Sequence, residues 1–202
     1  MDSFRSSGTD KWTLIPSILR DKIIGSRYWK EKCFALNTES LIDRASELAF
    51  VGFSYGGYNR PTPFLCLLAK MIQLEPDLDT ISTFLEFSAG SVTNNVDSQK
   101  RDLRYLRALT LSYIRLVCRP LVAYRLLEQF TSDYRLIIAL MPSGEFSRVS
   151  MDELIDLLLD QEDPLVWGFT FPHLTKRSTL MSRKELEEYS SPLSSELGLF
   201  TN

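Results

Sequence analysis

Few residues of this 202-residue sequence combine the types and spacing that enzyme chemistry requires. His173 is the single histidine, so a Ser-His-Asp or Cys-His centre would have to be built on it. It stands between proline and leucine in FTFPHLTKRS, a setting more typical of a packed or solvated loop residue than of a catalyst. The carboxylates of Asp152 and Asp156 share a predicted helix face, but no facing partner is apparent. The sequence therefore predicts a protein that is not an enzyme.

The three cysteines, Cys33, Cys66 and Cys118, are far apart and include no Cys-x-x-Cys pair. We interpret them as reduced core residues, because any disulfide scheme would leave one cysteine over. A single histidine also excludes a histidine-rich zinc site built from this chain alone. We predict no metal and no cofactor.

The composition is that of an ordinary globular protein, with 44% hydrophobic and 24% charged residues. The sequence has no run of 18 apolar residues, and its start, MDSFRSSGTDKW, lacks the apolar core of a secretory signal. We therefore expect no membrane-spanning segment. The net charge of −3 conceals a basic block at 100–148 and an acidic block at 149–202. Such alternation of charge is expected in a protein that binds both acidic and basic partners, and it also occurs in proteins that merely stay soluble.

An unusual turn precedes an apolar helical run in SYGGYNRPTPFLCLLAKMIQL, residues 54–74. Its glycines permit positive φ or close backbone approach, and its prolines push the residues before them into extended geometry. Thr62 is then expected to cap the following helix, with Pro63 as the first helical residue. The residues expected to shape the turn are Gly56, Gly57, Pro61 and Pro63.

Three roles compete for this turn: a phosphate cradle, a structural corner and a docking surface. The phosphate role fails, because the glycine spacing matches neither GxGxxG nor GxxxxGK[ST]. Tyrosine and arginine dominate interface hot spots, which favours docking, whereas a corner would bury the tyrosine rings. Both of these alternatives stay open. The residues predicted to bind a partner here are Tyr55, Tyr58, Asn59 and Arg60.

A second candidate surface comes from a predicted helix at 99–118. Projected at 100° per residue, its basic side chains fall within about 120° of one another. They are Lys100, Arg101, Arg104, Arg107 and Arg115. Arginine binds carboxylate or phosphate through its planar fork, so we predict Arg104, Arg107 and Arg115 as partner-binding residues. Three alternatives stay open: a solvated face paired with an acidic helix of the same chain, an acidic partner helix, and an RNA backbone.

The acidic helix in question follows a capping box formed by Ser150 and Glu153 in SMDELIDLLLDQ. Its predicted contact face consists of Asp152, Glu153 and Asp156. This face could meet the basic helix or a partner.

Apolar residues recur three and four positions apart in almost every segment, and the residues between these segments are of the types that cap helices. We predict helices at about 12–23, 28–34, 38–48, 63–74, 78–87, 99–118, 121–130, 131–139, 151–161 and 183–190. The aromatic residues Trp12, Tyr28, Trp29 and Phe34 are expected in the core, and Trp167, Phe169 and Phe171 are expected to pin a C-terminal arm to the body. The predicted fold class is all-α: a single compact multi-helix domain with an extended C-terminal arm and a short helix.

Several blocks of sequence, in order, resemble the pre-mRNA-splicing factor 38 family. They are YWKEKCFALNTESLIDRASEL, YGGYNRPTPFLCLLAKMIQLEP, DLRYLRALTLSYIRL, LLEQFTSDYRLI and VSMDELIDLLL. The match covers residues 12–177, which places a flexible N-terminus at 1–11, a polar loop insertion at 88–99 and a tail with a short charged helix at 178–202. The family usually reads YGGNxxPTPF, whereas here Tyr58 intervenes and the asparagine falls at Asn59.

The resemblance implies a nuclear, non-enzymatic scaffold of the spliceosome that arrives with the tri-snRNP and acts in the precatalytic B complex, before activation. The partners it implies are a zinc-finger protein and an elongated helical factor. An RNA-binding module that uses the basic helix 100–118 is the alternative function.

Overall fold

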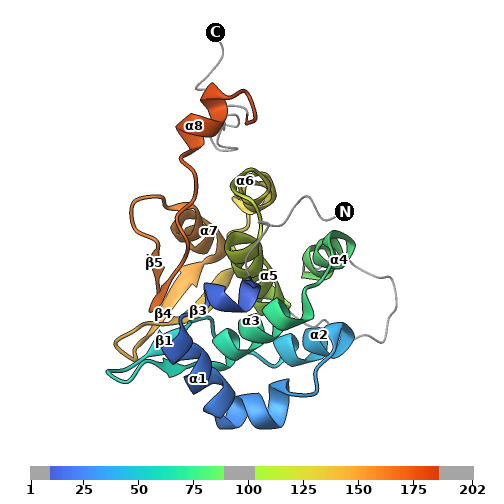
Figure 1. Cartoon of the computed structure of the whole chain (residues 1–202), viewed down its shortest axis with the longest axis vertical. Coiled ribbons are helices and arrows are strands. Elements are labelled where there is room, and N and C mark those ends of the chain that lie inside the picture. Colours follow the sequence, from blue (N-terminus) through green and yellow to red (C-terminus); the bar gives the residue numbers. More distant parts are fainter. Residues whose placement is uncertain (1–9, 89–102, 187–202) are drawn as a thin grey trace.

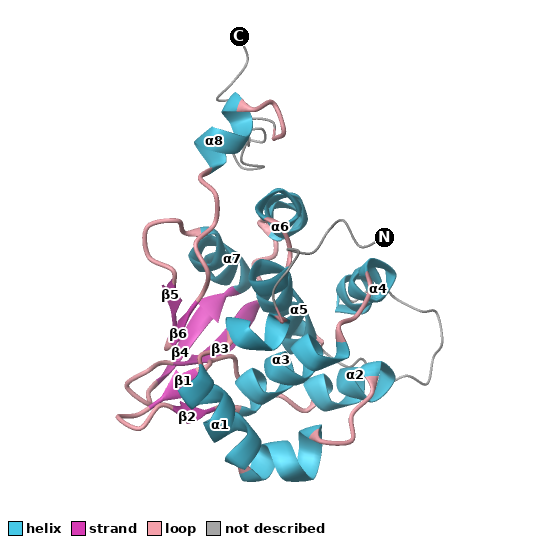
Figure 2. Ribbon diagram, viewed as in Figure 1, coloured by secondary structure: helices cyan, strands magenta, loops and turns pink. Residues whose placement is uncertain are grey.

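The computed structural model describes residues 10–88 and 103–186, in which helices dominate (Figures 1 and 2). Before the first gap, the helices are η1 (Lys11–Leu14), α1 (Ser17–Gly25), the π-helical turn η2 (Trp29–Cys33), α2 (Thr38–Ser46), α3 (Pro63–Leu74) and α4 (Leu78–Ser88). After it come α5 (Arg104–Val117), α6 (Pro120–Leu127), η3 (Glu128–Phe130), α7 (Met151–Leu159) and α8 (Arg177–Ser182). The strands are β1 (Ser54–Tyr55), β2 (Arg60–Pro61), β3 (Leu136–Leu140), β4 (Phe146–Ser150), β5 (Leu165–Val166) and β6 (Phe169–Thr170).

Helices α3 and α5 form the centre of the core. Every residue from Phe64 to Ile72 in α3 and from Leu106 to Val117 in α5 is buried. Two polar residues of α5 satisfy their hydroxyl groups within the helix: Thr110 donates to the Leu106 carbonyl and Ser112 to the Ala108 carbonyl, both at 2.8 Å. Helices α1, α2, α4, α6 and α7 lie around this pair, whereas α8 stands apart from it (Figure 1).

The helix caps predicted at Thr62 and Ser150 are confirmed. Asn37 and Ser40 form a capping box at the start of α2, and Thr62 accepts from the Leu65 N–H at 3.0 Å, with Pro63 as the first residue of α3. Ser150 caps α7, and its own N–H donates to Glu153 Oε2 at 3.0 Å. These bonds fix the directions in which the three helices leave their turns.

The fold is helix-dominated, as predicted, but it also contains short two-stranded sheets, so the all-α prediction is confirmed only in part. Residues 131–139, predicted as a helix, instead lead into β3, which pairs antiparallel with β4 from Leu136↔Ser150 to Leu140↔Phe146. In LIIALMPSGEFSRV, an apolar, partly β-branched run and an alternating polar and apolar segment flank a Pro-Ser-Gly turn, which is a hairpin signal. Val51 completes the arrangement: its N–H donates to the Ile138 carbonyl at 2.8 Å, and its carbonyl accepts from Leu140 at 2.7 Å.

Both ends of the described chain also depart from prediction. The first helix is broken at Pro16 into η1 and α1, and Phe34 is 76% exposed rather than part of the core. Trp29 is buried as expected. Near the C-terminus, α8 ends at Ser182, where a helix was predicted to begin, and Lys184 has φ of 58°. The remainder of that predicted helix and most of the loop 88–99 lie outside the described residues.

The C-terminal arm is pinned to the body by aromatic rings, as predicted. Phe169 and Phe171 pack against Phe53, with ring centroids 5.3 and 5.4 Å away, and all three rings are buried. Trp167, in the turn between β5 and β6, is only 8% exposed. This cluster holds the arm beside the β1–β2 turn.

Gly168 makes the closest backbone approach between the arm and the body. Its φ is +83°, and a Cβ there would lie 2.5 Å from the Ser54 carbonyl oxygen, while Ser54 Oγ donates to the Gly168 carbonyl at 2.7 Å. We expect Gly168→Ala to lower the free energy of unfolding by about 2 kcal/mol, measured by urea denaturation. Gly25→Ala, where an added Cβ meets nothing, is the matched control and should be neutral or stabilising. Equal stabilities of the two variants would contradict this account.

Candidate partner-binding surface

The glycine-tyrosine turn is a short hairpin in which Ser54 faces Pro61 and Tyr55 faces Arg60. The chain reverses through two left-handed residues, Gly56 with φ of 70° and Asn59 with φ of 46°. Asn59 therefore has a conformational role that its type permits, because asparagine tolerates this region better than most residues. Gly57 has no positive φ, and a Cβ there would meet nothing, so its predicted shaping role is not seen.

The turn projects into solvent rather than into the core. Residues 56–60 are exposed, Tyr58 is 80% exposed, and Tyr55 is half-buried. A buried corner would have packed both rings, so of the two alternatives the exposure favours a surface.

The turn is held by hydrogen bonds from two other parts of the fold. The Gly56 N–H donates to the Pro142 carbonyl at 3.0 Å, which links the turn to the β3–β4 hairpin (Figure 1). Lys22 Nζ of α1 donates to the Tyr58 carbonyl. The Thr62 N–H also donates to the Phe53 carbonyl at 3.1 Å. The backbone on which the exposed residues lie is therefore held in place by hydrogen bonds.

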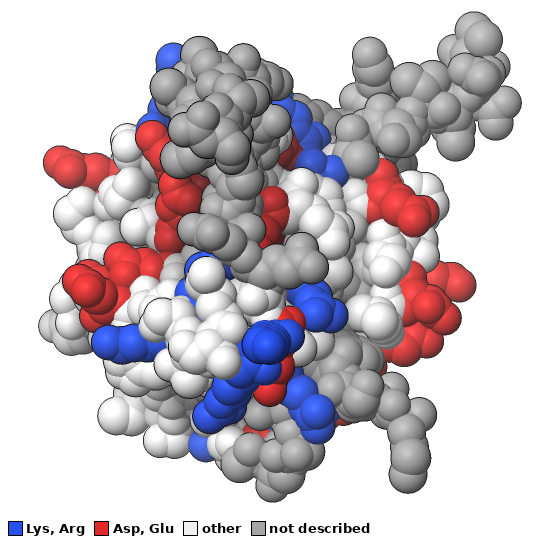
Figure 3. Space-filling view, turned by 90° about the horizontal axis from the view of Figure 1, so that it is seen from above, with Lys and Arg blue, Asp and Glu red and all other residues white. Residues whose placement is uncertain are grey.

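The predicted arginine stripe on α5 is wrong. Arg107 and Arg115 are 6% and 3% exposed, and Arg104 is half-buried, with a guanidinium N–H donated to the Leu136 carbonyl. Lys100 and Arg101 lie outside the described residues. The face viewed in Figure 3 shows basic and acidic side chains interspersed, not one basic surface. Arg107 and Arg115 therefore have structural roles, and the RNA alternative loses two of its predicted phosphate contacts.

Arg107 is part of a buried charge network centred on Asp133. Its Nη1 lies 2.5 Å from Asp133 Oδ2, which also accepts from Arg135 at 2.6 Å. Arg107 further donates to Ser88 Oγ at 3.1 Å and lies over the Phe130 ring. Burial raises the pKa of Asp133, but the hydrogen bonds from Arg135 and Arg107 lower it more, so the net direction is downward. The network joins α4, α5 and the segment before β3.

Arg115 binds backbone carbonyls instead of an acidic helix. Its Nε donates to the buried Leu158 carbonyl, in the last turn of α7, at 2.6 Å, and Nη2 donates to the Pro172 carbonyl at 2.7 Å. The guanidinium also lies 5.4 Å from the centre of the Phe171 ring. Burial lowers the pKa of Arg115 to about 10. The arginine is therefore a clamp between α5, α7 and the arm.

Among the residues that the structure describes, no ion pair joins the acidic residues of α7 to Arg107 or Arg115, so the alternative of pairing within the chain loses these two arginines. Glu153 and Asp156 are exposed, whereas Asp152 is half-buried. Burial, followed by the charges of Asp152 and Glu153, raises the pKa of Asp156. Of the predicted acidic contact face, Glu153 and Asp156 are therefore accessible to solvent, whereas Asp152 is partly covered.

Residues that could have supported catalysis are not assembled. His173 is exposed in the arm, and the three cysteines are buried and form no disulfide with one another. Burial raises the pKa of Cys33 to about 12 and that of Cys66 to about 11, so these thiols stay protonated near neutral pH. Within residues 10–88 and 103–186, no group of three His, Cys, Asp or Glu could hold a metal ion. Of the helices in these same ranges, none is both long and apolar enough to cross a membrane.

The family model described as the PRP38 family matches residues 5–184. The chain belongs to the PRP38 family. Pre-mRNA-splicing factor 38A of Homo sapiens is 38% identical over 196 residues, and that of Danio rerio is 38% identical over 190 residues. These alignments cover 97% and 94% of this chain, but 58% and 56% of the relatives, so the chain spans less than three-fifths of their length.

A solved structure shares the fold. It is a chain in the crystal structure of the Snu23-Prp38-MFAP1(217–258) complex of Chaetomium thermophilum, with 34% identity and a TM-score of 0.81. The comparison covers 94% of this chain and 91% of that chain. The PRP38-family resemblance predicted from the sequence blocks is confirmed, and the mixed, helix-dominated architecture is that of a solved relative.

Proposed function

We propose that this PRP38-family chain is a non-enzymatic protein-interaction scaffold of the spliceosome. The observation that carries the proposal is its likeness, over nearly the whole chain, to a protein crystallised in a Snu23-Prp38-MFAP1 complex. Its relatives are named pre-mRNA-splicing factors, which supports a role in splicing and a nuclear location.

The family resemblance gives the finer form of the proposal. The chain associates with the tri-snRNP, acts in the precatalytic B complex before activation, and binds a zinc-finger protein and an elongated helical factor. Affinity purification of the tagged chain from nuclear extract tests this. We expect tri-snRNP and B-complex proteins in the bound fraction, and their absence from a fraction that contains folded bait would reject the proposal.

We propose the glycine-tyrosine turn as one partner-binding site. Tyr55, Tyr58, Asn59 and Arg60 stand on a base held by α1 and by the β3–β4 hairpin. A braced surface loses little conformational entropy on binding, so its exposed aromatic and guanidinium groups are available for contacts.

Arg60→Ala should weaken partner binding while leaving the fold intact. We expect roughly a tenfold loss of affinity for the partners recovered in the purification, as for a hot-spot arginine, and an almost unchanged Tm, because the side chain is exposed. Isothermal titration and thermal unfolding measure the two quantities. Arg27→Ala, at another exposed arginine, is the matched control. A Tm lowered by several degrees with unaltered affinity would make the turn a structural corner.

A further inference from the structure

One face of the β3–β4 hairpin presents large apolar side chains to solvent. The register of the two strands places Leu136, Ile138, Phe146 and Arg148 together on this side, which we call the hairpin face. Leu136, Ile138 and Phe146 are 55%, 42% and 63% exposed. The Phe146 ring also packs edge-on against Phe50, with ring centroids 5.3 Å apart. Contiguous apolar side chains that stay exposed mark interaction sites.

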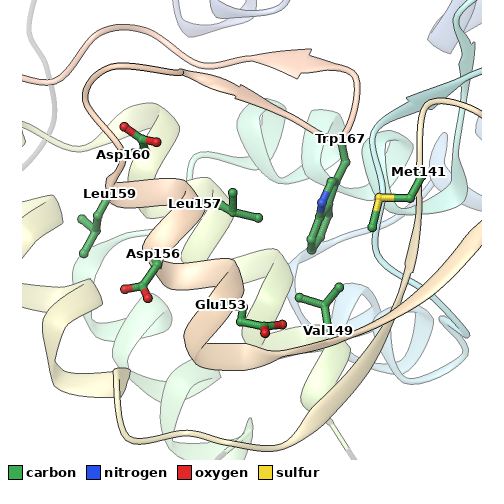
Figure 4. A pocket seen from close by; sticks show the side chains of 8 residues that line it. All are labelled: Met141, Val149, Glu153, Asp156, Leu157, Leu159, Asp160 and Trp167. Carbon is green, nitrogen blue, oxygen red and sulfur yellow. The ribbon is translucent and has the colours of Figure 1, made fainter.

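The opposite face of the same hairpin belongs to the core. Ile137, Ala139 and Val149 are buried there. Figure 4 shows Val149 near Trp167 in a pocket that Leu157 of α7 also lines. The hairpin is therefore packed against the body, and its exposure is confined to the hairpin face.

The edge of β3 that points away from β4 is closed by hydrogen bonds. The Ile138 carbonyl accepts from the Val51 N–H at 2.8 Å, and the Ile138 N–H donates to the Tyr105 hydroxyl at 3.4 Å. Arg104 donates to the Leu136 carbonyl. A further strand cannot add on this side, because its hydrogen-bonding groups are already used.

The outer edge of β4 is open. In an antiparallel pair, the backbone groups of successive residues point alternately toward and away from the neighbouring strand. Because Ile138 directs its N–H and carbonyl away from β4, the facing Arg148 directs its own away from β3, and so does Phe146. Within residues 10–88 and 103–186, no group bonds to these outward N–H and carbonyl groups. An unpaired edge of this kind is a template for another strand.

Arg148 adds a charge requirement to the hairpin face. It is exposed, and it forms no ion pair with any residue that the structure describes. A carboxylate is a group that a guanidinium binds through two parallel hydrogen bonds.

We propose that the open edge of β4 binds an extended segment of a protein partner, which adds to the hairpin as a third strand. Alternate residues of that segment lie over the hairpin face, with apolar side chains on Phe146 and Ile138 and an aspartate or glutamate facing Arg148. Main-chain hydrogen bonds supply affinity in this mode of recognition, and the alternate side chains supply specificity. The proposal rests on the scaffold function proposed above and names the chemistry of one partner.

The same observations disfavour two other occupants. A second copy that paired through its own β4 would bring no carboxylate to Arg148, because neither β3 nor β4 contains Asp or Glu. RNA binding depends on the neutralisation of several phosphates, and Arg148 is the one charged residue in these two strands.

The experiment places a photo-crosslinking phenylalanine derivative at Phe146 of the tagged full chain in nuclear extract. Mass spectrometry then identifies the captured peptide. We expect a segment in which apolar residues recur at every second position, with an Asp or Glu in the same alternation. This spacing distinguishes a strand from a helix, whose contacting residues are three or four apart.

Variants at Arg148 separate the backbone contact from the side-chain contact. Arg148→Ala removes the guanidinium and should lower the capture yield about tenfold, as for the loss of a charge pair in an interface. Arg148→Pro also removes the outward N–H, so we expect a further fall of about fivefold, the effect of one hydrogen bond. Proline is tolerated on an edge strand whose N–H faces solvent.

Two further variants serve as controls. Arg148→Glu keeps the N–H and reverses the charge, so its yield should fall below that of Arg148→Ala even if the proline variant does not fold. Arg183→Ala, at an exposed arginine outside the hairpin, should leave the yield unchanged. Thermal unfolding of each variant shows which of them are folded.

Several outcomes would overturn the proposal. They are capture of RNA, capture of a second copy of the chain, capture of a peptide with helical spacing, and equal yields from Arg148→Ala and folded Arg148→Pro. Absence of capture while B-complex proteins still co-purify would reject the β4 edge but leave the scaffold function standing. Failure of the scaffold function is recognised separately, by loss of all B-complex proteins from the same purification.

Discussion

Asp133→Asn is expected to lower the free energy of unfolding by about 3–5 kcal/mol, the range for breaking a buried ion pair. Asparagine keeps the shape of the side chain but removes the charge that neutralises Arg107, which is 6% exposed. It also removes the carboxylate that Arg135 contacts 2.6 Å away. Urea denaturation followed by tryptophan fluorescence measures the loss. The double variant Asp133→Leu with Arg107→Met should recover much of it, because no buried charge then remains unpaired.

The pH dependence gives an independent check on the same network. The pKa of Asp133 is lower in the folded state than in the unfolded chain, where a value of about 3.9 is typical. Its stabilising contribution is therefore present above pH 4 and is lost as the pH falls through the folded-state value. The native chain and Asp133→Asn should converge in stability on acidification. A difference that stays constant from pH 7 to pH 3 would contradict the assignment.

Arg115→Ala is expected to lower the free energy of unfolding by about 3 kcal/mol, through a cavity and an unsatisfied buried carbonyl at Leu158. The Pro172 carbonyl contributes less, because Pro172 is exposed and water can replace the guanidinium. Burial of the charged guanidinium is unfavourable, as the lowered pKa of Arg115 indicates. Removing it therefore recovers part of the lost free energy of unfolding. Urea denaturation measures the change in stability, and hydrogen exchange should show faster opening of the arm around Phe171.

Two variants calibrate this result. Arg115→Lys keeps a positive charge and can donate to one carbonyl, so its stability should be intermediate. Arg125→Ala removes an exposed arginine whose Nη2 donates to the Glu185 carbonyl at 2.9 Å, and it should change stability by less than about 0.5 kcal/mol. If Arg115→Ala matched Arg125→Ala, the clamp would contribute nothing measurable.

Local signals in the sequence were sufficient for much of the fold. Thr62 and Ser150 were recognised as helix caps because a cap depends on residues within one turn of it. The β3–β4 hairpin was missed because a short apolar run such as LIIAL fits a buried helix as well as a strand. Pairing with β4, directly after the Pro-Ser-Gly turn, decides between them, and the bridge from β3 to the distant Val51 adds a contact that no local pattern reveals.

The candidate sites divide in the same way. The exposed turn at Tyr58 was located by its glycines and prolines, which act locally. Arg107 and Arg115 were misplaced because a helical projection gives the direction of a side chain but not what covers it. Asp133 and the Leu158 carbonyl cover them, from segments 26 and 43 residues away. The pocket lined by Val149, Leu157 and Trp167 was not predicted from the sequence, because these residues belong to β4, α7 and the β5–β6 turn, which only the fold brings together.

The clamp at Arg115 has a consequence for synthesis on the ribosome. Its carbonyl partner at Pro172 lies 57 residues later in the chain. At about 5–20 residues per second, roughly 3–11 s separate the translation of the two residues. The α7 contact of Arg115 becomes available only after Leu158 is translated and the arm contact only after Pro172, so until then this side of α5 is not covered. We therefore expect packing around Arg115 to be completed only after the arm has emerged from the ribosome.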